Sequence, residues 1–353
     1  MATLQHPQPS ADAPRASGPL LDVRDLRTYF FVGRHTVVKA VDGVSFTVDR
    51  GEALGIIGES GSGKSVTSRS ILRIVDAPGR VVGGQVFFKG RDLLSLSERE
   101  MREVRGSQIG LIFQDPTTSF DPVFTIGDQL METVLAHRRI SREEARSQVL
   151  EALRLVGVGD GARVLGRYPV DFSAGFRQRL FIAMAMVLKP DLLIADEPTT
   201  TLGVTVQAEI LANLKSIQQE LGTAIILITH DFGVVSQVCS KIMVMYAGRA
   251  AEYASKRAVL TTPRHPYTVG LIRSVPLIEA KRTRRMHLIP GFPPDMTRLP
   301  PGCAFAPRCE RAQARCRQEV PALEALEPEH LAACYHPFST PEEAARGADG
   351  GRP

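Results

Sequence analysis

Eight residues early in the chain combine three glycines with a lysine and a serine, in the spacing G-x-x-x-x-G-K-[ST]. Glycines let the backbone curl with positive φ and turn successive N–H groups inward, where they cradle phosphate. The lysine can reach the β- and γ-phosphates of a nucleotide, and the serine hydroxyl can hold Mg²⁺. We therefore predict a nucleoside triphosphate and Mg²⁺ site on this loop. The loop comprises Gly58, Glu59, Ser60, Gly61, Ser62, Gly63, Lys64 and Ser65.

A second set of polar residues follows apolar runs that are typical of strands buried on both faces. Asp196 is expected to join the Mg²⁺ shell, and Glu197 to polarise the attacking water. His230 is expected to sense the γ-phosphate, and Gln114 to contact the same water or Mg²⁺. Taken singly, such residues at strand ends are usually structural. Because ligands bind at the carboxyl edge of an α/β sheet, these four side chains are predicted to meet the loop there.

The elements that must position these residues alternate between strands and helices. A buried strand at 53–57 and a helix at 66–75 are predicted on either side of the glycine-rich loop. The β-α-β alternation in the middle of the chain predicts a parallel α/β sheet. Antiparallel strands are expected over 20–48, with residues 29–31 on their first connection. A hairpin over 241–253 is expected at the edge of the sheet.

The composition is that of a soluble globular protein with a large core, with 43% hydrophobic and 23% charged residues among 353. No run approaches the roughly 18 apolar residues of a membrane span, and the start of the chain lacks the features of a secretion signal. We therefore expect a cytosolic protein whose membrane partner would be a separate chain. A net charge of +5 permits contact with nucleic acid without requiring it, and we expect no nucleic-acid partner.

Four motifs in a fixed order narrow the function. Gln114, residues 172–179, residues 192–198 and His230 together resemble the motif set of ABC-type ATPases, over about residues 20–255. The resemblance implies an enzyme that converts ATP and water to ADP and phosphate. It also implies an α/β fold of the P-loop NTPase class: an ABC-type nucleotide-binding domain with a parallel sheet core, an antiparallel β subdomain and a helical subdomain, followed here by a small C-terminal domain that contains cysteines.

ABC-type ATPases dimerise head to tail, so that each ATP lies between the P-loop of one subunit and the signature motif of the other. By this resemblance, Ser173 and Gly175 would contact the nucleotide of a partner subunit. The family also stacks adenine on an aromatic residue before the first hairpin. Phe30 fits that position best, with Tyr29 as the alternative, and plain core packing would also explain either ring.

A narrower resemblance involves residues 114–122, 264–268, 289–294 and 300–309, which look like the ATP-binding subunits of oligopeptide and dipeptide importers. Such subunits pair with a second, homologous ATPase and drive two transmembrane permeases, to which an extracytoplasmic protein delivers the peptide. The resemblance implies a peripheral protein on the cytoplasmic face of the inner membrane. No part of the sequence is expected to contact the cargo, so nickel, glutathione or another small solute is an alternative.

A soluble ABC ATPase that acts on ribosomes or DNA is an alternative of a different class. Such proteins usually carry two cassettes in one chain or a long coiled-coil insertion. This chain has one P-loop and no heptad repeat, which favours the transporter.

Two motifs depart from the usual family pattern, and by the resemblance both would act on the partner's nucleotide. The usual signature Leu-Ser-Gly-Gly carries Ala174 here, which adds a methyl group where backbone approaches the γ-phosphate and disfavours positive φ. The usual Ala-Leu-Asp after Glu197 lacks its aspartate. We therefore hypothesise a heterodimer in which the site on this chain's P-loop hydrolyses ATP and the opposite site is weaker. The altered segments are Phe172, Ser173, Ala174 and Gly175, and Thr201, Leu202 and Gly203.

Four of the five cysteines crowd the C-terminal part, which in a cytosolic protein points to metal or cluster binding rather than disulfides. Four thiolates suit Zn²⁺ or an iron–sulfur cluster. Structural zinc sites favour short C-x2–4-C pairs, which are absent here, and some similar importer subunits carry a [4Fe–4S] cluster. We expect the cluster, with zinc or free thiols as alternatives. The cysteines are Cys303, Cys309, Cys316 and Cys334.

These patterns divide the chain into four parts. Residues 1–18 are expected to be disordered, and residues 338–353 to form a flexible tail. Residues 19–260 are expected to form the ABC ATPase domain, with its helical subdomain at about 115–185. Residues 261–337 are expected to form a C-terminal domain of the peptide-importer type with the four-cysteine motif.

Overall fold

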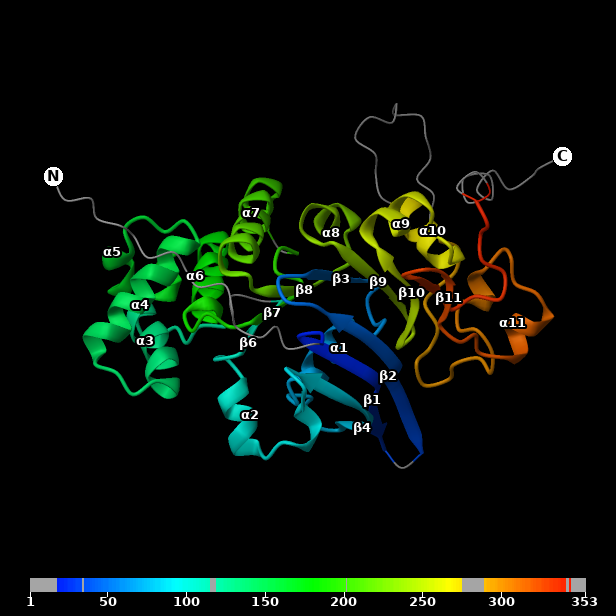
Figure 1. Ribbon diagram of the computed structural model, residues 1–353, viewed down its shortest axis with the longest axis horizontal. Coiled ribbons are helices and arrows are strands. Elements are labelled where there is room, and N and C mark those ends of the chain that lie inside the picture. The colour runs from blue at the N-terminus through cyan, green and yellow to red at the C-terminus, as the bar shows by residue number, and fades with distance from the viewer. Residues whose placement is uncertain are drawn as a thin grey trace.

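The computed structural model describes residues 18–33, 35–114, 119–200, 202–274, 289–340 and 343 (Figure 1). All but Gly18 of the predicted disordered start lies outside these residues. So does the predicted flexible tail, apart from residues 338–340 and 343.

A central sheet of eight strands organises the fold, in the order β11-β12-β10-β9-β3-β8-β7-β6. Its five strands from β9 to β6 are parallel. They are almost wholly apolar because both faces are covered. In β3, Leu54 and Ile56 join one hydrophobic core, whereas Ala53 and Ile57 join the other. The parallel strands are β3 (Ala53–Ile57), β6 (Ile109–Ile112), β7 (Leu192–Asp196), β8 (Ala224–Thr229) and β9 (Lys241–Tyr246).

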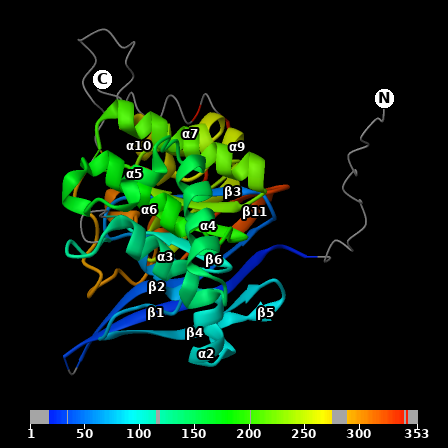
Figure 2. The ribbon, with the colours of Figure 1, turned by 90° about the vertical axis from the view of Figure 1, so that its left-hand side faces the viewer.

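Helices cover one face of the central sheet, and a smaller antiparallel sheet with helix α1 covers the other (Figures 1 and 2). The smaller sheet has the strand order β2-β1-β4-β5. Its strands are β1 (Leu21–Val32), β2 (Thr36–Val48), β4 (Gly79–Phe88) and β5 (Arg91–Asp92). The helical face carries α7 (Val204–Leu221), α8 (Phe232–Val238), α9 (Lys256–Thr261) and α10 (Pro266–Arg273). On the side of the smaller sheet lie α1 (Lys64–Ile71), the short η1 (Leu93–Ser95) and α2 (Glu98–Val104).

The prediction that residues 29–31 form a connection between strands is wrong, because they lie within β1. Phe30 pairs with Val38 of β2 on one side and with Gly79 of β4 on the other. Both edges of β1 are thus paired at Phe30, and pairing with β2 alone carries the strand on to Val32.

A helical subdomain lies at one end of the molecule (Figure 1). Its helices bury apolar positions at helical spacing against one another, as in Val149 and Leu153 of α4. The start of α4 is fixed by a capping box, in which Ser141 and Glu144 each bond the other's backbone N–H. The elements are α3 (Ile126–His137), α4 (Arg142–Leu155), α5 (Gly161–Leu165), η2 (Pro169–Asp171) and α6 (Ala174–Met186).

The C-terminal region continues the central sheet. Strand β10 (Arg249–Ser255) pairs with β9 and also with β12 (His330–Ala332), and β12 pairs with β11 (Glu324–Glu327). The predicted hairpin of β9 and β10 is confirmed, but its predicted place at the sheet edge is wrong, because the chain returns to add two strands. The remaining elements, η3 (Ala306–Arg308) and α11 (Ala314–Gln318), lie at the end opposite the helical subdomain (Figure 1).

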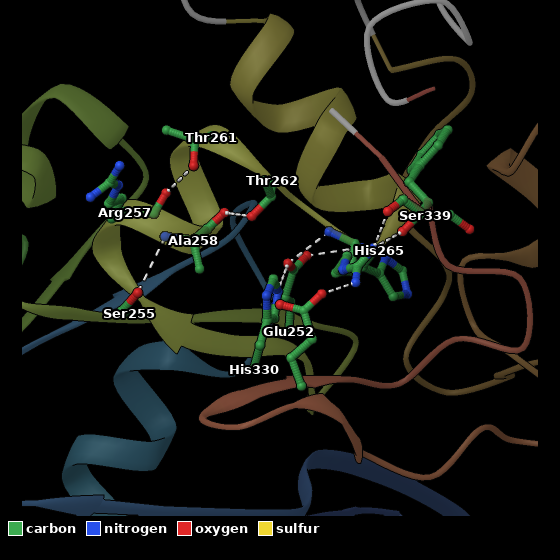
Figure 3. A network of polar contacts seen from close by, with 12 residues as sticks. Glu252, Ser255, Arg257, Ala258, Thr261, Thr262, His265, His330 and Ser339 are labelled. Atoms are coloured by element: carbon green, nitrogen blue, oxygen red, sulfur yellow. Dashed lines mark hydrogen bonds and ion pairs between the residues drawn. The ribbon is translucent and has the colours of Figure 1, made fainter. Parts of the chain in front are cut away.

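A buried carboxylate fastens this addition. Glu252 of β10 is 0% exposed and accepts hydrogen bonds from the backbone N–H groups of Arg264 and His265 and from Nε2 of His330, at 2.8, 2.9 and 2.7 Å (Figure 3). A buried carboxylate needs such partners because its desolvation is costly. Glu252 therefore links β10, the start of α10 and β12.

Within the described part of the chain, no helix combines the length and the apolar character that a membrane crossing requires.

Candidate nucleotide site

The glycine-rich loop runs from the end of β3 into α1, as predicted. Gly63 has a φ of 102°, and a Cβ atom there would lie 2.2 Å from the carbonyl oxygen of Ala40. A Cβ atom on Gly58 would lie 2.3 Å from the carbonyl oxygen of Met245. Only glycine fits these positions, so the loop is held close against β2 and the end of β9.

The Lys64 ammonium lies across this loop. Its Nζ donates to the carbonyl oxygens of Gly58 and Glu59, at 2.8 and 3.0 Å, and the residue is 5% exposed. The pKa of Lys64 lies below its usual value because the ammonium is buried. The nearby carboxylates of Glu197, Asp196 and Glu59 offset part of this shift. The structure thus places the cation beside the inward-facing loop, where it can meet a phosphate.

Ser65 and Asp196 are brought together, as predicted. The Ser65 hydroxyl donates to Oδ1 of Asp196 at 2.9 Å, and Asp196 is 4% exposed. The pKa of the Asp196 carboxyl lies above its usual value because the group is buried, and the Ser65 hydrogen bond offsets part of this shift. A hydroxyl and a carboxylate are hard oxygen donors of the kind that Mg²⁺ prefers, so these two residues fit the ion.

Glu197 gathers three partners at the same sheet edge. Its Oε2 accepts from Nε2 of Gln114 at 3.1 Å and from the hydroxyl of Thr200 at 2.8 Å, and its Oε1 lies 3.5 Å from Nδ1 of His230. Its backbone is left-handed, with a φ of 48°, and its N–H donates to the carbonyl oxygen of Ile228. A strained backbone of this kind is typical of functional sites. Thr200 was not predicted, because a threonine in a loop carries no signal of its own.

The two aromatic candidates for adenine differ in their surroundings. The Tyr29 hydroxyl donates to Oδ1 of Asp42 at 2.6 Å, and the ring lies near the Lys39 ammonium. Phe30 packs against Gly79, where a Cβ atom would lie 2.6 Å from its ring. Both rings are partly buried, and they differ in that the Tyr29 hydroxyl is bonded to Asp42 whereas Phe30 packs beside Gly79. Phe30 as the adenine contact therefore stays a prediction.

The signature segment lies at the start of α6. The exposed Ser173 is the N-cap, and its hydroxyl accepts from the N–H of Phe176 at 3.3 Å. A Cβ atom on Gly175 would lie 2.5 Å from Val206 of α7, so close packing requires glycine. Ala174 is the first helical residue and its φ is not positive, so the argument from positive φ is wrong and only its added methyl group remains. Among the described residues, no hydrogen bond joins this segment to the P-loop.

The second altered motif lies partly outside the described residues, at Thr201. Gly203 is the N-cap of α7 and provides no side-chain cap. An aspartate there would cap the helix, since aspartate is among the preferred N-cap residues.

The four C-terminal cysteines line one small cavity, together with Arg311 and His265 among others. Burial raises the pKa of the Cys303 and Cys309 thiols, and raises that of Cys334 to about 12. Over the described ranges, no three His, Cys, Asp or Glu side chains are grouped so as to hold a metal ion. The structure therefore brings the cysteines together around a cavity without arranging them as ready-made ligands. The fifth cysteine, Cys239, is buried.

Two residues of the C-terminal region also reach the P-loop, and neither was predicted. The Tyr267 hydroxyl accepts from the N–H of Glu59, and the Arg308 guanidinium pairs with the Glu59 carboxylate. They lie 208 and 249 positions away from Glu59 in the sequence. Both lie in segments that resemble importer subunits, which was the only available signal.

Known proteins are similar to this chain over nearly its full length. The family model for ABC transporters matches residues 41–200, and the model for the oligopeptide/dipeptide transporter C-terminal region matches residues 251–316. A probable peptide ABC transporter ATP-binding protein of Sinorhizobium fredii is 51% identical, covering 90% of this chain and 94% of the relative. The oligopeptide transport ATP-binding protein OppD of Salmonella typhimurium is 46% identical, covering 93% and 97%. The dipeptide transport ATP-binding protein DppD of Bacillus subtilis is 44% identical, covering 94% and 98%.

A solved structure confirms the cassette fold. The dimeric ATP-binding cassette MJ0796, in a post-hydrolysis state with ADP and phosphate, superposes with a TM-score of 0.61 at 25% identity. The match covers 67% of this chain and 99% of that cassette. The chain therefore belongs to the ATP-binding subunits of ABC transporters that carry the oligopeptide/dipeptide transporter C-terminal region, and it is an ATPase.

Proposed function

We propose that this chain hydrolyses MgATP to drive the import of oligopeptides or dipeptides. The observation that carries the proposal is the convergence of Gln114, Asp196, Glu197 and His230 on the P-loop edge of one sheet. The peptide cargo is supported by relatives that are named for oligopeptide and dipeptide transport. Uptake of labelled peptides into proteoliposomes that contain the complete complex tests it. Uptake without ATP, or ATP turnover that no peptide changes, contradicts the proposal.

Within the site, each residue has a distinct role. Lys64 and the N–H groups of the P-loop bind the β- and γ-phosphates. Ser65, Asp196 and Gln114 would hold Mg²⁺, which when bound neutralises phosphate charge. Glu197 orients and polarises the attacking water, and Gln114 and Thr200 hold its carboxylate in place. His230, which lies beside Glu197, contacts the γ-phosphate and so senses whether it is present. Phe30 stacks on adenine.

The chain acts as one half of a heterodimer with a second, homologous ATPase. Ser173 is exposed at the N-terminus of α6, where a helix end favours an anion supplied from outside the chain. Ser173 and Gly175 therefore face the partner's nucleotide. Because Ala174 and Gly203 alter only this surface, the site on this chain's own P-loop is the stronger one.

The transporter includes two transmembrane permeases and an extracytoplasmic peptide-binding protein. The chain docks to the permeases at the cytoplasmic face of the membrane. Purification of the chain from its host, with identification of what accompanies it, tests this assembly. Recovery with nucleic acid or ribosomes in place of permeases contradicts it.

The four-cysteine cavity binds a [4Fe–4S] cluster in the native protein. The proposal is supported by four thiols around one cavity and by the absence of short cysteine pairs typical of structural zinc sites. Anaerobic purification, with iron, sulfide and zinc assays, tests it. The variant Cys309→Ser should lose iron, whereas Cys239→Ser should retain it. Zinc without iron, or neither metal in the native protein, contradicts the cluster.

A further inference from the structure

Glu59, the second residue of the P-loop, is held from the C-terminal region at two points. Its backbone N–H donates to the Tyr267 hydroxyl at 2.8 Å. Its carboxylate receives both terminal nitrogens of Arg308, with distances of 2.6 Å to Oε2 and 3.0 Å to Oε1. A two-pronged pair of this kind fixes direction as well as distance. The backbone and the side chain of Glu59 are therefore both fixed by residues that lie outside the ATPase motifs.

Both anchors are themselves rigidly supported. Arg308 has a side chain only 5% exposed, and it also bonds the carbonyl oxygen of Pro290 and the Tyr246 hydroxyl, at 2.9 and 3.3 Å. Tyr267 is fully buried, and its ring lies 4.5 Å from that of Tyr246 and 5.3 Å from that of Phe305. The contact is thus built into a packed aromatic cluster rather than made by a mobile surface side chain.

The support of Tyr267 extends to the network in Figure 3. The N–H of Tyr267 donates to Nδ1 of His265 at 3.0 Å, and the N–H of His265 donates to Glu252. Glu252 in turn receives Nε2 of His330 on β12. A continuous chain of hydrogen bonds therefore leads from the added strand to the P-loop backbone.

Glu59 matters to a nucleotide in two ways. Its carbonyl oxygen is one of the two that receive the Lys64 ammonium, so the orientation of this peptide influences where Lys64 lies. Its carboxylate is 25% exposed beside a site for a polyphosphate, and like charges there repel. Arg308 opposes that repulsion by neutralising the carboxylate.

Taking the P-loop as the ATP site proposed above, we infer that Arg308 and Tyr267 are positioning residues for nucleotide binding. They orient the Glu59 peptide and cancel its charge, so that the C-terminal region sets the affinity of the P-loop for ATP. Neither residue needs to touch the nucleotide.

The test measures binding of a non-hydrolysable ATP analogue with Mg²⁺ to the full chain by calorimetry. Arg308→Gln should weaken binding about tenfold, because it leaves Glu59 charged and unpaired. The double variant Glu59→Gln with Arg308→Gln should recover about threefold or more of that loss, because the repelling charge is gone. Arg315→Gln, which removes an equal charge from the exposed pair with Glu319, is the matched control and should bind as the wild type does.

Each outcome decides the inference. Wild-type affinity in Arg308→Gln, or a double variant as weak as the single one, overturns it. If thermal unfolding shows that Arg308→Gln is not folded, the binding affinity of Tyr267→Phe decides the inference. This variant removes only the hydroxyl that accepts from the Glu59 N–H. About threefold weaker binding in Tyr267→Phe supports the inference, and unchanged binding overturns it. Lys64→Ala separates the two proposals, because binding that survives this change contradicts the P-loop site itself.

Discussion

The two surfaces that we propose to contact nucleotide are built very differently. Around the P-loop, Lys64 and Asp196 are almost completely buried, and Glu197 has partners from three segments. At the start of α6, Ser173 is exposed, and the hydrogen bond that its hydroxyl accepts comes from its own helix. The first surface is arranged before any ligand arrives, whereas the second would be completed only by the proposed partner subunit. A preorganised site tolerates change poorly, so the two surfaces should respond differently to mutation.

The largest effect is expected on the preorganised side. Glu197→Gln should lower ATP turnover of the reconstituted complex by about 100-fold or more, because it removes the group that we propose to polarise the attacking water. Glu143→Gln on the exposed first turn of α4 is the matched control. The comparison fails if Glu197→Gln barely reduces turnover while the equivalent change in the partner subunit abolishes it.

A core substitution tests the aromatic packing of the C-terminal region, which holds Tyr267 beside the P-loop. Phe305→Ala should destabilise that region by about 3 kcal/mol, because a nearly buried ring beside Tyr246 and Tyr267 is lost. Chemical denaturation with and without nucleotide measures it. Phe292→Ala, which truncates a ring that is 91% exposed, is the control. Equal stability of the two variants would contradict the packing argument.

A smaller effect is expected at the signature. Gly175→Ala should lower the free energy of unfolding by about 1–3 kcal/mol, because the new methyl group would lie 2.5 Å from Val206. Thermal unfolding of the full chain measures the loss. Gly166→Ala, where nothing lies within 4 Å of the added carbon, should change stability by less than about 1 kcal/mol. If Gly175→Ala loses no more stability than Gly166→Ala, the packing argument is contradicted, because α7 would have shifted to make room for the methyl group.

The smallest effect sharpens the comparison itself. With Glu197→Gln in place, the residual turnover should come from the opposite site. Adding Ala174→Gly should raise that turnover about twofold, because it removes a methyl group worth only a fraction of a kcal/mol at a helix start. Steady-state phosphate release measures it. No change, or a decrease, would show that Ala174 does not weaken the opposite site.

The sequence predicted the local parts of the site well and the distant parts poorly. The P-loop was predictable because its glycines and Lys64 act within one short segment, and the strand-end residues because apolar runs mark buried parallel strands. The course of β1 through residues 29–31 was missed because pairing on both edges extends it. Arg308 and Tyr267 were missed because no local pattern indicates which distant loop a side chain will reach.

The eight-stranded sheet has a practical consequence for anyone who shortens this protein. Cutting the chain after the cassette would remove β12 and leave β10 as an open edge with unpaired backbone groups, which invites self-association. It would also strip Glu252 of His330, Arg264 and His265 and leave its charge without partners. We therefore expect the ATPase core and the C-terminal region to unfold together, and a truncated cassette would not report the behaviour of the whole.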